Sequence, residues 1–251
     1  MAQICTGPAA GGSAREVLFV KHLSYHHRYD SSDLYFDDLS ALIQHCPNLE
    51  DVFLGFNIHD SRQGQLSAFK QLPNLRRLHG DIGGITMAQM TVCPIFQNLT
   101  HLETYTSGEQ FNFELLCSMK SLTHLSLTNP NLWDHVFVQG LQKILDRECG
   151  CHLLQVVILH SPPLEITDIR VVTLWRSLSG HGEKRWMDSI NGKLRNWEFA
   201  EKIVLARKKG YMKFIPNQAL HPAWLDKDVE LSSEGQEWWG DAQFSSLGHG
   251  W

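Results

Sequence analysis

A leucine-based frame, L-x-x-L-x-L, recurs along the first two thirds of the chain. Four copies align directly, as PNLEDVFL from Pro47, PNLRRLHG from Pro73, QNLTHLET from Gln97 and KSLTHLSL from Lys120. A further copy begins at Leu154, and a degenerate first copy begins at Val20. The first apolar residues of successive copies lie 29, 26, 24, 23 and 32 residues apart. Such self-similarity predicts a stack of similar units that share one continuous core.

The second half of each frame predicts a β-strand, and the segments between frames predict helices. The last two apolar positions of a frame are two residues apart, so both side chains point to the same side of a strand. Three intervening segments carry apolar residues at helical spacing, behind acidic or amide residues suited to a helix start. These stripes are Leu39, Leu42, Ile43 and Cys46 after Asp37 and Asp38; Leu115, Leu116 and Met119 after Asn112; and Phe137, Leu141, Ile144 and Leu145 after Asp134.

These frames resemble the leucine-rich-repeat superfamily. Their irregular spacing and NL lead-ins are similar to the repeat region of F-box-like proteins of mushroom-forming fungi. The ending is similar too, because the strand Asp168 to Leu174 is followed by a tryptophan-rich loop and a helix from Trp197 to Lys209. Over residues 16–213, the resemblance implies an α/β leucine-rich-repeat solenoid. Such a fold is a short horseshoe with parallel strands on its concave face, helices on its convex face, and here a C-terminal helical cap.

Two features depart from the family pattern. The superfamily has asparagine at the ninth repeat position, and only Asn57 matches it; the equivalent residues are Gly83, Ser107, Pro130 and Pro162. We therefore expect the turns to differ between units. The leader ahead of Val17 is too short for an F-box, so we expect this chain to lack that helical module.

Composition changes near residue 175 and divides the chain into four expected segments. Seven of the eight tryptophans lie at or after Trp175. Asn196 can cap a helix whose Phe199, Ile203 and Ala206 share one face and which ends at Gly210. We expect a flexible leader over 1–15, about six leucine-rich repeats over 16–168, a strand-loop-helix cap over 169–213, and a tail without fixed structure over 214–251.

Charge and hydropathy predict that the chain has no nucleic-acid or membrane partner, and we expect a monomer. Apolar residues make up 43% of the chain and the formal net charge is −5, which gives no general attraction to nucleic acid or anionic lipid. No stretch approaches the ~20 apolar residues of a transmembrane helix, and the first residues do not resemble a secretory signal. We therefore expect a cytoplasmic or nuclear protein.

The sequence carries no motif that predicts catalysis, a cofactor or a metal. The nucleophile elbow, the phosphate-binding loop and the H-E-x-x-H zinc helix are all absent from it. Cys149, Cys151 and His152 come closest to a metal cluster, but no second pair of ligands follows nearby in sequence. We interpret this segment as a turn that closes the preceding helix. We expect no enzyme activity.

The positions between the leucines predict a partner-binding surface. Counting the first leucine as one, positions three, five and seven point away from the core, and six of these eighteen positions are histidine where composition predicts about one. We expect His101 and His124 to stand side by side, because neighbouring strands lie ~4.8 Å apart. The candidate partner-binding residues are His22, His26, Asp51, Phe53, Arg77, His79, Asp81, His101, Glu103, Tyr105, His124 and His160.

The sequence therefore favours a protein–protein interaction module. The family resemblance implies substrate recognition for an F-box-type ubiquitin ligase. Two alternatives stay open, namely a non-functional or divergent relic of a duplicated F-box-like family and a histidine-rich metal-binding protein. Because histidine can charge near neutral pH, we expect partner binding at this face to weaken as the pH falls.

Overall fold

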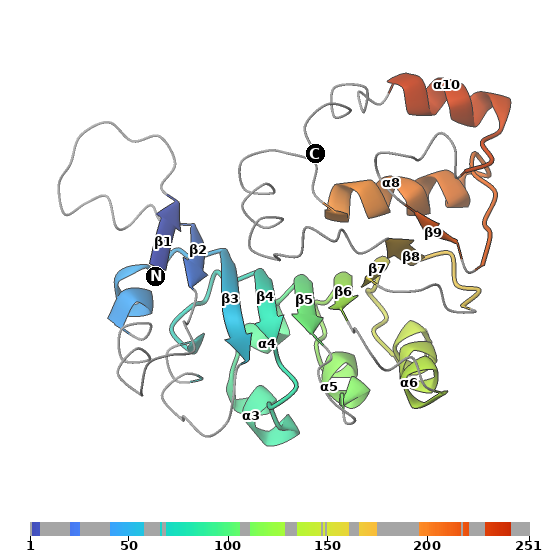
Figure 1. Cartoon of the computed structure of the whole chain (residues 1–251). Helices are drawn as coiled ribbons and strands as arrows, with labels where there is room; N and C mark the ends of the chain where they lie inside the picture. Colours follow the sequence, from blue (N-terminus) through green and yellow to red (C-terminus); the bar gives the residue numbers. More distant parts are fainter. Residues whose placement is uncertain are drawn as a thin grey trace, which may run out of the picture. The chain divides into compact units, whose positions relative to one another are not determined.

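The protein is an α/β protein with an open sheet of eight parallel strands, preceded by one antiparallel strand (Figure 1). The computed structural model describes residues 2–5, 21–25, 41–57, 66, 69–105, 111–128, 135–146, 148, 150–160, 166–174, 196–216, 218–220 and 229–241. Its strands follow chain order in the sheet. They are β1 (Ala2–Cys5), β2 (His22–Tyr25), β3 (Asp51–Asn57), β4 (Arg77–Asp81), β5 (His101–Tyr105), β6 (His124–Thr128), β7 (Val156–His160), β8 (Val171–Leu174) and β9 (Ala219–Leu220).

The chain divides into two compact units. Unit 1 comprises Met1–Leu125 and Asp134–Leu154, and unit 2 comprises Ser126–Trp133 and Gln155–Trp251. This boundary differs from the expected one at residue 169, because β7, which holds the last leucine frame, packs with the C-terminal elements. The two units are described separately below.

The leucine frame of unit 1 corresponds to a repeated backbone geometry. In each copy, the amide N–H groups of positions two and three both donate to the position-two carbonyl of the preceding copy. Glu50 and Asp51 donate to Lys21 at 2.9 and 3.0 Å, and the same pattern returns at Arg76 with Arg77, Thr100 with His101, and Thr123 with His124. The predicted parallel pairing is confirmed for β2–β3, β3–β4 and β4–β5.

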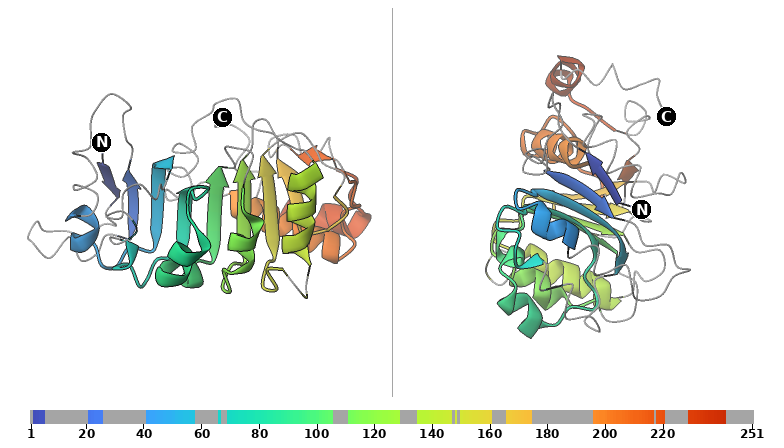
Figure 2. Two further views of the ribbon diagram at one scale, coloured as in Figure 1. Left: turned by 90° about the horizontal axis from the view of Figure 1, so that it is seen from below. Right: turned by 90° about the vertical axis from the view of Figure 1, so that its left-hand side faces the viewer.

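The recurring leucines line one side of these strands. Leu54, Leu78, Leu102 and Leu125 are buried, as are the first leucines of the frames, Leu49, Leu75, Leu99 and Leu122. Figures 1 and 2 show helices α3 (Met87–Val92) and α5 (Phe113–Cys117) on one face of the strands of unit 1. The core of unit 1 therefore lies between the leucine face of the sheet and the returning segments, as the frame predicts.

Local capping chemistry defines several helix ends in unit 1. Thr86 and Gln89 form a capping box at the start of α3. Asn112 caps α5 by accepting from the Glu114 N–H at 3.0 Å, and the helix lies behind Asn112 as expected. Helix α4 (Ile95–Asn98) is a single short turn.

The predicted apolar stripe of α6 (His135–Leu145) is confirmed, since Phe137, Leu141, Ile144 and Leu145 are all buried. The chain then turns as expected, because the Gly150 N–H donates to the Asp146 carbonyl at 3.0 Å. In the earlier stripe, residues 41–45 are helical and Ile43 and Cys46 are buried. Leu39, Asp37, Asp38 and Asp134 lie outside the described residues.

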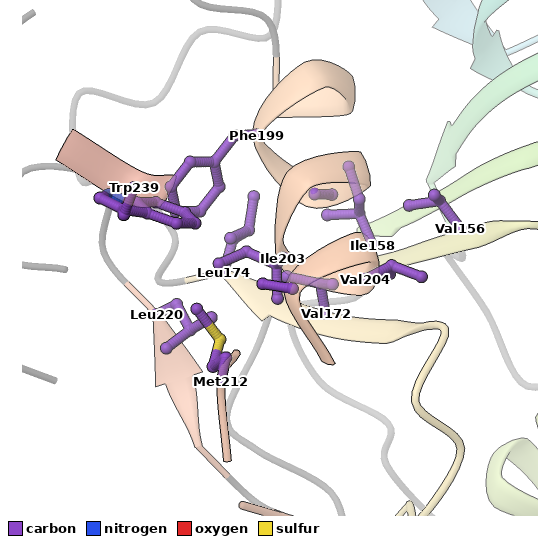
Figure 3. Packing of buried hydrophobic residues seen from close by; sticks show 12 residues of the cluster. Val156, Ile158, Val172, Leu174, Phe199, Ile203, Val204, Met212, Leu220 and Trp239 are labelled. Carbon is purple, nitrogen blue, oxygen red and sulfur yellow. The ribbon is translucent and has the colours of Figure 1, made fainter. Parts of the chain in front are cut away.

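Unit 2 is built around helix α8 (Asn196–Lys208), which packs over β7 and β8 (Figure 3). Phe199, Ile203 and Ala206 are buried, which confirms the predicted helix face. The helix ends before Gly210, whose φ of 73° is the left-handed conformation that favours glycine. Trp197, Trp238 and Trp239 pack in the same apolar cluster.

Regular elements lie in both terminal segments. In the segment expected to be a flexible leader, Ala2–Cys5 forms β1, which pairs antiparallel with β2. In the segment expected to lack fixed structure, Ala219–Leu220 forms β9 and Ser233–Asp241 forms helix α10. Composition alone missed α10 because its stability comes from burying Trp239 against Phe199, a contact distant in sequence.

Candidate functional site

The predicted partner-binding residues of unit 1 form two rows across neighbouring parallel strands. The first polar row consists of His22, Asp51, Arg77 and His101, which are successive partners in the sheet register. The second row consists of Ser24, Phe53, His79 and Glu103, which are also successive partners. The register therefore brings together residues that lie more than twenty positions apart in sequence.

Asp51 contacts side chains on both neighbouring strands of the first polar row. Its Oδ2 lies 3.3 Å from Arg77 Nε and 3.7 Å from His22 Nδ1, so one carboxylate faces cationic or titratable groups on both neighbouring strands. The Asp51 side chain is only 6% exposed, while those of Arg77 and His22 are 26% and 25% exposed. Asp51 thus anchors two partly accessible side chains.

The second row combines a ring stack with an ion-pairing contact. Phe53 and His79 stack with ring centroids 4.2 Å apart and an interplanar angle of 27°. His79 Nδ1 lies 3.0 Å from Glu103 Oε2 on the next strand. Phe53 and His79 are buried and Glu103 is half-buried, so Glu103 is the accessible member of this group.

His101 and His124 stand side by side, as predicted. Their ring centroids are 4.1 Å apart and the ring planes differ by only 3°. His124 is buried and His101 is half-buried. Thr100 and Thr123, the residues just before them, hydrogen-bond the Nδ1 atoms of the two rings at 2.9 and 2.8 Å. Sequence reasoning missed these threonines, although the repeated L-T-H-L of the two frames could have identified them.

The expected position-seven row does not form across β3 and β4. The register changes between Phe53 and Asn57, so Asp81 pairs with Asn57 and not with Gly55. The cause is two extra residues in β3 between consecutive paired positions. Asp81 is buried and accepts a hydrogen bond from the Gly83 N–H at 2.7 Å, which makes it part of a local turn.

The remaining candidates do not join these rows in the described structure. Tyr105 ends β5, but its side chain lies outside the described atoms, and His26 lies outside the described residues altogether. His160 belongs to unit 2, where it is buried on β7 and pairs in register with Leu174.

In β7, positions three and five hold Val156 and Ile158. Helix α8 covers these side chains, so this part of the expected surface is buried (Figure 3). A continuous apolar run from Val156 to Leu159 is typical of a strand covered on both faces. In unit 1, the accessible part of the rows is limited to the half-buried His22, Arg77, His101 and Glu103.

Comparisons with known proteins do not assign the chain to a family. No family model matches the sequence, and no curated protein matches it. Among the described helices, none combines the length and apolar character that crossing a bilayer requires.

Replacing Asp51 with asparagine should lower the free energy of unfolding by about 1–3 kcal/mol, because the negative charge of a buried carboxylate is lost beside Arg77. Glu50→Gln is the matched control, since Glu50 is 40% exposed and its ion pair with Lys21 is at the surface. That change should stay within about 0.5 kcal/mol. Urea unfolding measures both changes in free energy. Equal effects of the two substitutions would contradict the claim that Asp51 anchors the side chains of the first polar row.

Proposed function

We propose that this chain is a leucine-rich-repeat module that binds another protein through the two polar rows of unit 1, and that it is not an enzyme. The observation that carries the proposal is the alignment of His22, Asp51, Arg77 and His101 on four adjacent parallel strands. At ~4.8 Å per strand, the row extends over about 14 Å. Side chains spread over this length can each contact a different part of a partner protein.

The chemistry of the rows supports protein recognition. Arg77 is a donor on a partly accessible side chain, Glu103 is a partly accessible acceptor, and His101 offers a partly accessible imidazole ring. Arginine and aromatic or imidazole rings held in place by neighbours lose little conformational entropy when a partner binds. Asp51 and Glu103 hold Arg77 and His79 in this way.

The leucine-rich-repeat assignment is part of the same proposal. It is supported by the buried leucine frame and by the repeated hydrogen bonding at each frame start. The horseshoe curvature, a monomeric state and a cytoplasmic or nuclear location are further parts of the proposal. Substrate recognition for an F-box-type ubiquitin ligase is its narrowest form, and the sequence resemblance alone supports that.

The test is quantitative affinity purification with the whole chain from the native host, in the presence of a metal chelator. Proteins retained by wild type but lost with Arg77→Gln are the candidate partners, and calorimetry with each purified candidate follows. We expect Arg77→Gln and the His101→Ala, His124→Ala pair each to weaken binding at least about tenfold, which is ~1.4 kcal/mol. Lys120→Glu changes an exposed charge outside the rows and should leave affinity unchanged.

Two further measurements separate the parts of the proposal. Affinity should decrease from mildly alkaline to mildly acidic pH, because histidines of the rows gain charge. Co-purification of a cullin-ligase adaptor would support the ubiquitin-ligase form, and its absence would restrict the proposal to protein binding. Partner affinity that is the same for wild type, Arg77→Gln and the double histidine variant contradicts the proposed surface.

A further inference from the structure

Two cysteines from consecutive repeats of unit 1 lie together, although they are distant in sequence. Cys117 is the last residue of α5, and Cys151 lies in the turn that follows α6. The two helices pack together, and Lys143 Nζ of α6 lies 2.9 Å from Glu114 Oε1 of α5. The Cys151 Sγ donates to the Leu116 carbonyl at 3.2 Å, which places it at the peptide bond that joins Leu116 to Cys117.

The backbone holds both cysteines in place. The Cys151 N–H donates to the Ile144 carbonyl in the last turn of α6 at 3.0 Å, and the Cys151 carbonyl accepts from the Leu154 N–H at 2.9 Å. Gly150 precedes it where the chain passes so close to the end of α6 that a Cβ would overlap carbonyl oxygens of that helix. Cys117 is fixed by the last turn of α5. The approach of the two side chains is therefore a property of the folded repeats.

The two thiols are in direct contact and differ in exposure. Cys117 and Cys151 hydrogen-bond each other through their sulfur atoms. A disulfide bond is ~2.05 Å long, so sulfurs in such contact need to approach by about 2 Å to form one. Cys117 is half-buried and Cys151 is buried. A small oxidant from solvent therefore reaches Cys117 first and leaves Cys151 as the second thiol.

Packing alone does not require a thiol at the position of Cys151. This position, three residues before the first leucine of a frame, holds Leu72, Phe96 and Met119 in three other frames, and all three are buried. A cysteine is smaller than any of these and adds a sulfur that can react with a second sulfur. In the last frame of the chain, that second sulfur is provided by Cys117 of the frame before it.

We propose that Cys117 and Cys151 form a reversible disulfide when the chain meets a peroxide, and that this bond links two consecutive repeats. The Cys117 thiolate attacks one peroxide oxygen, the O–O bond breaks, and Cys117 becomes a sulfenic acid. The Cys151 thiolate then attacks the Cys117 Sγ, and the S–O bond breaks. Each step releases hydroxide, which takes up the proton that a thiol has lost. Two thiols and one peroxide thus give one disulfide and two waters, and a dithiol reductant reverses the oxidation of the pair.

The reaction should be slow at neutral pH and faster in alkali. Desolvation by burial raises the pKa of the Cys117 thiol, and Glu114 raises it too, while Lys143 and the Cys151 thiol lower it. The net effect is a raised pKa, so the thiol is protonated at neutral pH, and only the thiolate attacks a peroxide. We expect the rate of disulfide formation to increase about tenfold per pH unit from neutral pH towards that pKa.

Treatment of the whole reduced chain with hydrogen peroxide tests the proposal, followed by tandem mass spectrometry of its peptides. We expect the intact chain to lose two hydrogens, the peptides to be joined through Cys117 and Cys151, and dithiothreitol to restore both thiols. The oxidised chain should unfold at a higher urea concentration than the reduced chain, because the bond restricts the unfolded state. These readouts need no variant.

Two serine variants separate the roles of the cysteines. Cys151→Ser keeps a hydroxyl that can donate to the Leu116 carbonyl, and its oxidation should stop at a Cys117 sulfenic acid that dimedone traps. Cys149→Ser is the matched control, because Cys149 lies two positions away in sequence, and it should form the same disulfide as wild type.

Three outcomes overturn the proposal. They are a disulfide through Cys149 in the wild-type chain, a disulfide that still forms in Cys151→Ser, and a wild-type chain that keeps both thiols at peroxide concentrations that already oxidise its methionines. A rate of disulfide formation that does not change with pH also contradicts it, because the attacking group would then not be the Cys117 thiolate.

Discussion

Replacing Gly140 with alanine should destabilise the protein by about 2–3 kcal/mol, although alanine is the better helix former. Gly140 lies within α6, where alanine usually gains about 1 kcal/mol over glycine. A Cβ at this position would overlap Cδ2 of Phe113, far inside the van der Waals contact distance. The Phe113 ring cannot move aside freely, because it packs edge to face against Phe111 and Phe137. Overpacking therefore outweighs helix propensity.

Urea unfolding measures this effect, and two further variants isolate its cause. Gly240→Ala is the matched control, since it lies in α10 and a Cβ there has nothing within 4 Å; it should be neutral or stabilising by up to about 1 kcal/mol. Phe113→Leu combined with Gly140→Ala should be more stable than the two single effects added together, with a coupling of about 1 kcal/mol or more. A Gly140→Ala protein as stable as wild type would show that α5 and α6 do not pack this closely.

Replacing Arg207 with alanine should destabilise the protein by about 3 kcal/mol. Arg207 is buried in unit 2, and its Nη1 donates to the main-chain carbonyls of Ile169 and Val171 at 3.2 and 2.6 Å. Its guanidinium also lies 4.7 Å from the centre of the Phe214 ring. Alanine removes these contacts and the packing of the aliphatic stem together.

Arg207→Met distinguishes packing from charge. Methionine restores much of the volume without the charge, so it should recover part of the loss seen with alanine. Lys208→Ala, an exposed neighbour in the same helix, should change the free energy of unfolding by less than about 0.5 kcal/mol. An Arg207→Ala protein as stable as Lys208→Ala would show that the guanidinium does not tie α8 to the start of β8.

The buried charge of Arg207 also predicts a pH dependence. Desolvation lowers the pKa of Arg207 to about 10 in the folded protein. Above this pH, and until the arginine of the unfolded chain also loses its proton, the unfolded chain binds the proton more tightly. The wild-type free energy of unfolding should therefore rise with pH relative to that of Arg207→Met. Below pH 10 the difference between the two proteins should be constant. Denaturant midpoints at increasing alkaline pH measure it, and a falling difference contradicts the assignment.

The strand positions of unit 1 could be predicted because their causes are local and periodic. A leucine frame with two-residue spacing determines which side of each strand is apolar, and its recurrence determines the partner residues of successive strands. The 23-residue spacing from Leu99 to Leu122 places His101 beside His124 without knowledge of any other contact. The Asn112 cap and the buried face of α6 are predictable for the same reason.

The burial and register of the two rows of unit 1 could be predicted only in part. The rows were expected, but the burial of Asp51 and His79 depends on partners on other strands, Arg77 and Glu103. The change of register in β3 was missed because it lies between two frames that align well in sequence. One signal was available for unit 2, since the unbroken apolar run of β7 indicates a strand with a second covered face.

The sequence by itself determined the repeating strands, the inward leucines and the order of histidines along the sheet. Side-chain alternation and repeat length are properties of the covalent chain, so they need no tertiary information. Only the tertiary structure decided that α8 covers Val156 and Ile158, that α10 is ordered, and that threonine hydroxyls orient the paired rings. Each of these depends on contacts between segments far apart in sequence, whose free energy arises only when the chain is folded.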